Sequence, residues 1–256
     1  MKAYEFVTIV DGGEAASLVL NRSPLNIMNI AMLEEINAAL EELQKLPNAK
    51  VFLIKAKGKA FSAGVDVADH TAEKIEDMMR ELHRMFELLH GFRLPTIAVV
   101  DGPALGGGCE LALFCDLVIA SARATFGQPE VKVGVFPPIA TAILPRLVGR
   151  NRTLDLLMSG ETISAAEAER IGMINKKFPV EDFAKHVSEF VGKLTVHSKV
   201  VLEMTKRAVD GGLYRPCMEA MQRGEELYMR EMMNTEDAHE GLKAFLEKRQ
   251  PVWKNR

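Results

Sequence analysis

Three consecutive glycines in Ala104-Leu-Gly-Gly-Gly-Cys-Glu110 lie between a predicted strand and a predicted helix. Glycines lack a β-carbon and let a ligand approach the backbone closely. The first N–H groups of a helix have no internal partner and carry partial positive charge. Such an end can bind an anion, or an oxygen that becomes negative during a reaction. The alternative is that the glycines serve only tight packing.

Glu110 strengthens the functional interpretation of these glycines. If Gly107 begins the helix, Glu110 lies one turn further on nearly the same face. Its neighbours are apolar, so we expect a buried carboxyl with a raised pKa. The alternative is a structural carboxylate bonded to a nearby basic side chain or amide.

A second carboxylate stands in Phe126-Gly-Gln-Pro-Glu130, ahead of a mostly apolar stretch. Two carboxyls in apolar surroundings suggest a pair that takes up and gives off protons. On its own, Glu130 would more often be a glutamate at a helix start, and Pro129 fits that alternative.

The third segment, Gly58 to Asp66, is a small-residue turn that can bring backbone N–H groups towards a ligand. It comes close to the nucleophile turn of serine hydrolases, but Ala60 stands where that motif needs glycine. We therefore do not expect Ser62 to be a nucleophile. The phosphate-loop and dinucleotide motifs are not matched, and the six histidines show no zinc spacing, so no metal is expected.

Apolar patterning predicts the elements that must position these residues. Strands alternate with helices in the first half, and helices dominate from Pro145 onwards, which indicates an α/β layered fold with a helical C-terminal part. Near-continuous apolar strands predict a sheet covered on both faces. The predicted elements are a hairpin of Val7–Val10 and Ser17–Leu20, a helix from Asn29 to Leu46, strands 50–55, Thr96–Val100 and Leu117–Ala120, and helices Thr71–Leu89 and Cys109–Phe114.

The composition of the chain limits which classes of binding partner are expected. The chain of 256 residues has 48% hydrophobic and 26% charged residues and a net charge of −3, which argues against nucleic acid or an acidic membrane as partner. The three cysteines, Cys109, Cys115 and Cys217, have no metal-ligand spacing and are expected to be reduced. The N-terminal segment lacks the apolar core of a signal peptide, and no stretch is long enough to span a bilayer, so a cytoplasmic location is expected.

Taken in order, these segments resemble the enoyl-CoA hydratase/isomerase (crotonase) superfamily over nearly the whole chain. The matching segments are Leu20-Asn-Arg22, Leu25-Asn-Ile-Met28, Phe61-Ser-Ala-Gly-Val-Asp66, Ala104–Ala112, Phe126–Glu130, Gly160-Glu-Thr-Ile-Ser-Ala165, Ala168–Ile174 and Glu240–Arg249. The resemblance implies an α/β fold: a crotonase-like spiral of ββα units over residues 1–195 and a C-terminal helical trimerisation region over 196–256. It also implies a homotrimer or a dimer of trimers.

The resemblance implies the site residues as well. The N–H groups of Val65 and Gly107 would form an oxyanion hole, and Glu110 and Glu130 would handle water and proton. No cofactor is implied, since coenzyme A is part of an acyl-CoA substrate. Residues implied in substrate or coenzyme A binding are Asn26, Ala63, Val65, Asp66 and Ala68, with Phe245 and Lys248 from a neighbouring subunit.

The chain departs from the commonest hydratase pattern after the second glutamate. Phe136-Pro137-Pro138-Ile139 replaces a glycine-rich loop, and Pro137, Pro138 and Ile139 are expected to reshape the acyl pocket. Ala68 stands where many relatives carry lysine. The Gly64–His70 run together with the Phe-Pro-Pro loop most resembles the cyclohexa-1,5-diene-1-carbonyl-CoA hydratases of anaerobic aromatic degradation.

Three other activities stay open at the level of sequence. A double-bond isomerase of the same superfamily needs only one proton-shuttling carboxylate, so the presence of both glutamates favours hydration. An acyl-CoA thioester hydrolase would release free coenzyme A. A non-catalytic RNA-binding relative would lack the glutamates or carry a basic face, and this sequence shows neither.

Overall fold

The computed structural model describes residues 3–213, 227–228 and 230–256, without the side chains of Phe245 and Leu246. A six-stranded sheet has the order β1-β2-β3-β4-β6-β9, in which β1 and β2 pair antiparallel and all other neighbours pair parallel. Its strands are β1 Val7–Gly12, β2 Ala15–Leu20, β3 Val51–Ala56, β4 Thr96–Val100, β6 Leu117–Ser121 and β9 Lys176–Phe178.

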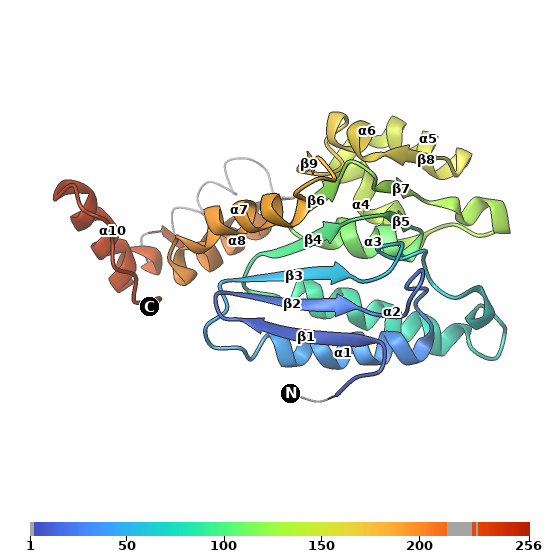
Figure 1. The fold of residues 1–256 in the computed structure, drawn as a ribbon, viewed down its shortest axis with the longest axis horizontal. Coiled ribbons are helices and arrows are strands. Elements are labelled where there is room, and N and C mark those ends of the chain that lie inside the picture. The colour runs from blue at the N-terminus through green and yellow to red at the C-terminus, as the bar shows by residue number, and fades with distance from the viewer. Residues whose placement is uncertain (1–2, 214–226, 229) are drawn as a thin grey trace.

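Helices cover both faces of this sheet, as Figure 1 shows. Along β3, Phe52 and Ile54 pack into the core shared with α1 and α2, while Val51 and Leu53 pack on the other face with Val187 and other residues of α7. The near-continuous apolar strands are thereby explained, and the predicted double-sided burial is confirmed. The helices are α1 Ile30–Leu43, α2 Ile75–His90, α3 Gly107–Phe114, α4 Pro138–Val148, α5 Arg150–Ser159, α6 Ala165–Arg170 and α7 Phe183–Thr195.

A small second sheet carries the glycine-rich segment. It has the order β5-β7-β8, with β5 and β7 parallel and β7 and β8 antiparallel. Because β5 ends directly before the glycines and β7 directly before Gln128, this sheet brings the two glutamate segments side by side. Its strands are β5 Pro103–Leu105, β7 Thr125–Gly127 and β8 Thr162–Ser164, and the short 3-10 turns are η1 Val67–Asp69, η2 Pro129–Val133 and η3 Met232–Asn234.

The longer predicted elements are confirmed with small shifts. The hairpin and β4 occur as predicted, and the side chain of Asn29 accepts the Met32 N–H at 3.0 Å as the N-cap of α1. The second helix begins at Ile75 rather than Thr71. The prediction that helices dominate beyond Pro145 is confirmed, and the structure adds the strands β8 and β9, which have three residues each.

The C-terminal helices α8 (Lys199–Gly212) and α10 (Glu236–Leu246) extend away from the sheets (Figure 1). No residue of α8 is fully buried. The Lys206 ammonium ties α8 to the sheet by a 2.7 Å contact with Asp116 Oδ2. Among the described residues, no helix is both long and apolar enough to cross a bilayer.

Candidate active site

Two backbone turns meet where the predicted oxyanion donors, Val65 and Gly107, lie. A β-carbon built on Gly107 would lie 2.7 Å from Val65 Cγ2 and 3.5 Å from Val65 N, and one on Gly108 would lie 2.4 Å from the Ser62 carbonyl oxygen. Glycine is required here because a side chain would push the turns apart. Within the described residues, neither the Val65 nor the Gly107 N–H donates to another protein atom. Both can therefore serve an oxygen atom of a ligand.

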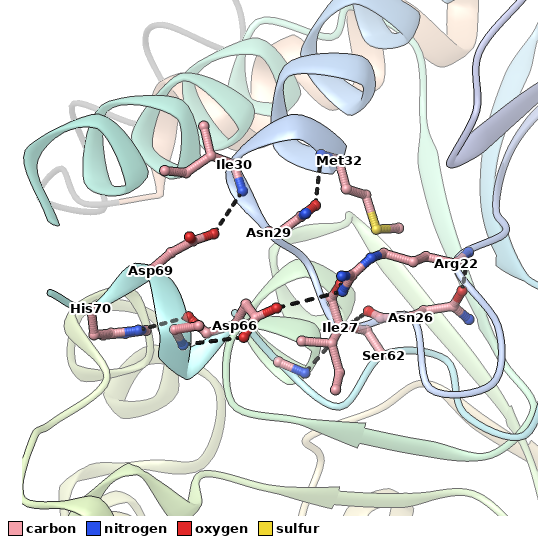
Figure 2. Close-up of polar contacts among 12 residues, drawn as sticks. Arg22, Asn26, Ile27, Asn29, Ile30, Met32, Ser62, Asp66, Asp69 and His70 are labelled. Atoms are coloured by element: carbon pink, nitrogen blue, oxygen red, sulfur yellow. Dashed lines mark hydrogen bonds and ion pairs between the residues drawn. The ribbon is translucent and has the colours of Figure 1, made fainter. Parts of the chain in front are cut away.

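The buried Ser62 ties this turn to the loop that follows β2, as Figure 2 shows. Its hydroxyl donates to the Asn26 carbonyl oxygen at 2.7 Å and accepts the Gly64 N–H at 3.2 Å. Asn26 has a φ of +50° and donates its side-chain amide to the carbonyl oxygens of Lys57 and Ala60 at 2.7 and 2.9 Å. The Ser62 hydroxyl thus links two backbone segments, and its lack of a nucleophilic role stays a prediction.

Two carboxylates hold η1, which continues from the Val65 turn (Figure 2). Asp66 accepts the Ala68 N–H at 3.1 Å, and its Oδ2 lies 3.7 Å from Arg22 Nη1. The buried Asp69 accepts the N–H of Ile30, the first residue of α1, at 3.0 Å. These contacts anchor the far side of the Val65 turn to the main core.

Glu110 lies in α3 with 2% of its surface exposed. Its Oε1 accepts the Ala140 N–H at 2.8 Å, and the Ile139 N–H also points at the carboxylate. The pKa of Glu110 is raised to about 7, chiefly by burial, with a smaller contribution from the negative charge of Glu130, while the N–H donors of Ala140 and Ile139 oppose the rise. The predicted burial and pKa direction are confirmed, and the partners of Glu110 are backbone amides of α4.

Glu130, in η2, lies against the glycine turn. Its Oε1 is 2.7 Å from the position of a β-carbon built on Gly106. Burial raises the pKa of Glu130, while a hydrogen bond to its own N–H and the charge of His70 lower it. With its amide nitrogen turned towards Glu130, the buried Gln128 donates to both carboxylate oxygens at 3.2 Å. Glu130 is therefore held by the neutral Gln128 amide and remains half-buried.

Glu110 and Glu130 act on each other electrostatically and border the same turn. Their titration belongs to the pair, because each charge changes the other's affinity for a proton. Such a pair can deprotonate water at one carboxyl and protonate carbon at the other. In the described part of the chain, no three His, Cys, Asp or Glu side chains are grouped to hold a metal ion.

The loop of residues 136–139 stands where the commonest hydratase pattern has a glycine-rich loop, and the helix that follows it, α4, binds Glu110. Pro137 is the N-cap of α4 and Pro138 its first residue, and neither has an N–H. The first donors of α4 are thus those of Ile139 and Ala140, which bind Glu110. Pro137 is buried, Pro138 exposed and Ile139 half-buried against the core. Their role in shaping an acyl pocket stays a prediction.

The residues expected to bind coenzyme A fall into two groups. Ala63, Asp66 and the exposed Ala68 lie around the Val65 turn. Lys248 follows α10, which lies far in space from α3, at the other end of the molecule (Figure 1). The side chain of Phe245 lies outside the described residues. A single chain does not bring Lys248 to the site.

Sequence reasoning missed three contributors to the site: the Ala140 N–H, Gln128 and His70. Pro138 could have revealed the first, because proline favours the first position of a helix and the next N–H groups then face an anion. Gln128 and His70 lie in segments that the sequence singled out, but no pattern pairs either of them with Glu130.

Comparisons with known proteins agree with this geometry. A family model described as enoyl-CoA hydratase/isomerase matches residues 13–256. The cyclohexa-1,5-dienecarbonyl-CoA hydratase of Thauera aromatica is 35% identical over 246 residues, which cover 95% of this chain and 94% of that protein. The crotonyl-CoA hydratase of Syntrophomonas wolfei is also 35% identical, over 96% of this chain and 97% of that protein.

Solved structures show the same fold. The crystal structure of an enoyl-CoA hydratase from Bacillus anthracis superposes with a TM-score of 0.93 at 30% identity, over 98% of this chain and 100% of that chain.

Proposed function

The chain belongs to the enoyl-CoA hydratase/isomerase (crotonase) superfamily and has its α/β fold, and on this premise we propose that it hydrates the C=C bond of an α,β-unsaturated acyl-CoA thioester. The observation that carries the proposal is the pair of Glu110 and Glu130 beside the free N–H groups of Val65 and Gly107. Its activity is of the enoyl-CoA hydratase type, a hydro-lyase. The substrate and the roles of individual residues are proposals.

In the proposed reaction, the thioester carbonyl oxygen accepts hydrogen bonds from Val65 N–H and Gly107 N–H. These donors stabilise the negative charge that builds on this oxygen as an enolate forms, and loss of one such donor typically costs on the order of 10²–10³ in rate. No cofactor is required, because the thioester itself delocalises the charge.

The two glutamates divide the proton transfers. Glu110 removes a proton from water as the water oxygen attacks the β-carbon, and its two α4 N–H donors orient the carboxylate. Glu130 gives a proton to the α-carbon of the enolate. Each turnover leaves Glu110 protonated and Glu130 ionised, and one proton must be released and another taken up before the next.

For the acyl group, we propose a cyclic dienoyl-CoA of the cyclohexa-1,5-diene-1-carbonyl type. Overall sequence identity does not discriminate between a cyclic and a linear acyl group, because the cyclohexa-1,5-dienecarbonyl-CoA hydratase and the crotonyl-CoA hydratase are equally similar to this chain. The supporting feature is the rigid Pro137-Pro138 entry to α4 next to Glu110, which differs from a flexible glycine-rich loop.

An absorbance screen of linear and cyclic enoyl-CoAs tests the proposal by following loss of the conjugated thioester band. We expect turnover by wild type and strong loss in Glu110→Gln and Glu130→Gln, with the exposed Glu161→Gln as control. Wild-type turnover in either site variant would contradict the paired scheme. Faster hydration of crotonyl-CoA than of the cyclic dienoyl-CoA would contradict the proposed acyl group.

Two other activities give different products. A double-bond isomerase would move the alkene without adding water, which mass spectrometry of the product distinguishes. A thioester hydrolase would release coenzyme A, which a thiol reagent detects. The paired carboxyls favour hydration over both.

We further propose that residues 1–195 form the spiral core and that 196–256 build a homotrimer, alone or paired into a hexamer. Exposed apolar side chains in this region support the proposal, among them Val209, Leu213, Tyr228 and Leu242. In such an assembly Lys248 would reach the site of a neighbouring subunit. Light scattering coupled to size exclusion measures the assembly, and a monomer would refute it. The expected cytoplasmic location stays a prediction for cell fractionation.

A further inference from the structure

We propose that Met28 is a positioning residue that sets the spacing between the two N–H groups of the oxyanion hole, those of Val65 and Gly107. The inference rests on the proposed hydration and deepens it, because it explains how donors from two separate segments are held at one point. Met28 itself takes no part in the proposed proton transfers.

The backbone of Met28 is bonded to both neighbours of Val65. Its N–H donates to the Gly64 carbonyl oxygen at 2.8 Å, and its carbonyl oxygen accepts the Asp66 N–H at 2.9 Å. These two bonds make a parallel bridge between Met28 and Val65. In such a bridge, the residue between the two bonded neighbours turns its own N–H to the opposite side of the chain. The Val65 N–H therefore points away from the Met28 backbone and stays open to a ligand.

The side chain of Met28 reaches the second donor. A β-carbon built on Gly107 would lie 3.5 Å from Met28 Cε and 3.5 Å from Val65 N. The methyl end of Met28 and the Val65 nitrogen therefore flank the same point, where α3 begins. Met28 is fully buried, so this methyl group is part of a packed interior.

Met28 is itself held firmly in place. The Ala63 N–H donates to the Leu25 carbonyl oxygen at 2.9 Å, so the loop after β2 is joined to the Val65 turn at a further point. Directly after Met28, the Asn29 side chain caps α1 by accepting the Met32 N–H at 3.0 Å. Since α1 packs in the main core, the core fixes Met28, and Met28 can fix the two donors.

Packing must set the spacing of the two donors, because two N–H groups cannot hydrogen-bond to each other. Methionine is unbranched and fills an irregular gap of this kind. Loss of its side chain would leave a void beside the first turn of α3, which the surroundings close only in part. Gly107 would then shift relative to Val65, and one carbonyl oxygen could no longer accept well-aligned bonds from both.

Kinetics of Met28 variants test this role. Met28→Ala removes the side chain and keeps the backbone bridge. A misplacement of about 1 Å can cost on the order of 10² in rate, and loss of one donor on the order of 10²–10³, so kcat should fall roughly 10–100-fold. KM should change little, because coenzyme A is bound elsewhere. Met28→Leu, which has a similar volume, should stay close to wild type.

Two further variants separate this effect from a general loss of packing. Met85 in α2 is also fully buried, so Met85→Ala removes the same side chain from the core away from the donors. It should lose stability and keep wild-type kcat. Met28→Val leaves a smaller void than Met28→Ala, and its kcat should fall between those of Met28→Leu and Met28→Ala. It therefore gives the answer if Met28→Ala does not fold.

A spectroscopic measurement reports on the donors without turnover. Two N–H groups that bind the carbonyl oxygen of cinnamoyl-CoA draw electron density towards it and move its conjugated thioester band to longer wavelength. In a Glu110→Gln background, which should not activate water, we expect this shift in full with Met85→Ala added. The shift should be smaller with Met28→Val or Met28→Ala added.

An unchanged band shift or wild-type kcat in folded Met28→Val would overturn the proposal. An equal loss of band shift with Met85→Ala would also overturn it, because the effect would then belong to core packing in general. If wild type hydrates no enoyl-CoA but shifts the band, the proposed function fails, and the shift still decides the role of Met28. Without any shift in the presence of Met28, the two donors do not bind a carbonyl oxygen together, and the inference fails.

Discussion

Replacing Gly106 by alanine is expected to separate Glu130 from the backbone turn on which the proposed chemistry depends. The added β-carbon would lie 2.7 Å from Glu130 Oε1, where ordinary contact begins at 3.4 Å. The carboxylate must therefore retreat by about 0.7 Å, the difference between these two distances. Since this oxygen is the tip of a flexible side chain, the retreat itself costs little stability.

The expected magnitudes follow from two separate effects. A misplacement of about 1 Å can cost on the order of 10² in rate, so kcat should fall roughly 10–100-fold. The backbone at Gly106, with φ +51° and ψ −130°, is one that alanine rarely adopts, and this strain should cost about 1–3 kcal/mol of folding free energy. A 10–100-fold loss of kcat corresponds to about 1.4–2.7 kcal/mol, so the two effects are of similar size and must be measured separately.

The assay compares kcat with urea-denaturation stability for Gly106→Ala and Gly172→Ala. Gly172 has φ +77° and nothing within 4 Å of an added β-carbon, so it reports backbone strain alone. We expect Gly172→Ala to lose stability and keep wild-type kcat. A folded Gly106→Ala enzyme with wild-type kcat would refute the reasoning, because Glu130 would then not need its place against the turn.

Three further results are expected. Because burial raises the pKa of Glu110 to about 7, kcat/KM should fall as the pH drops below about 7 and the base becomes protonated. The pKa of Glu110 in the folded protein lies above its ordinary value of 4.5, so protonation of Glu110 favours the fold. The free energy of unfolding should therefore decrease as the pH rises from about 4.5 through 7, by about 3 kcal/mol at 1.36 kcal/mol per pH unit. Glu110→Gln, which keeps an acceptor for α4, should therefore unfold at higher urea than wild type at pH 8 and at similar urea at pH 4.5. Ser62→Ala leaves the Gly64 N–H and Asn26 carbonyl unpaired, which should cost about 1–3 kcal/mol in urea unfolding and only part of kcat, whereas complete loss of turnover in a folded variant would indicate a nucleophile.

Periodicity predicted the fold wherever an element was long enough to show it. The apolar run of Thr96–Val100 and the helical spacing after Asn29 depend on burial against one continuous core. The strands β5 and β7 have three residues each, and their pairing is set by the parallel register Pro103↔Thr125 between distant segments. Nothing in three residues encodes such a partner.

The same limit applies to the site. The spacing from Gly107 to Glu110 is local, so a helix places both near one face, and the sequence predicted this. The donor to Glu110 comes from Ala140, thirty residues further on, and depends on how α4 packs on α3. Glu130 meets Gly106 only because β5 and β7 pair and bring the two segments together.

The unequal burial of the two carboxyls affects how substrate binding tunes them. Burial raises the pKa of both, to about 7 for the almost fully buried Glu110, where the charge of Glu130 contributes to the rise. The proposed hydration needs Glu110 ionised and Glu130 protonated. An acyl group that covers the half-buried Glu130 would remove water from it and raise its pKa further, while the Ala140 N–H continues to favour ionised Glu110. Binding of substrate should therefore favour the protonation states that the proposed reaction needs.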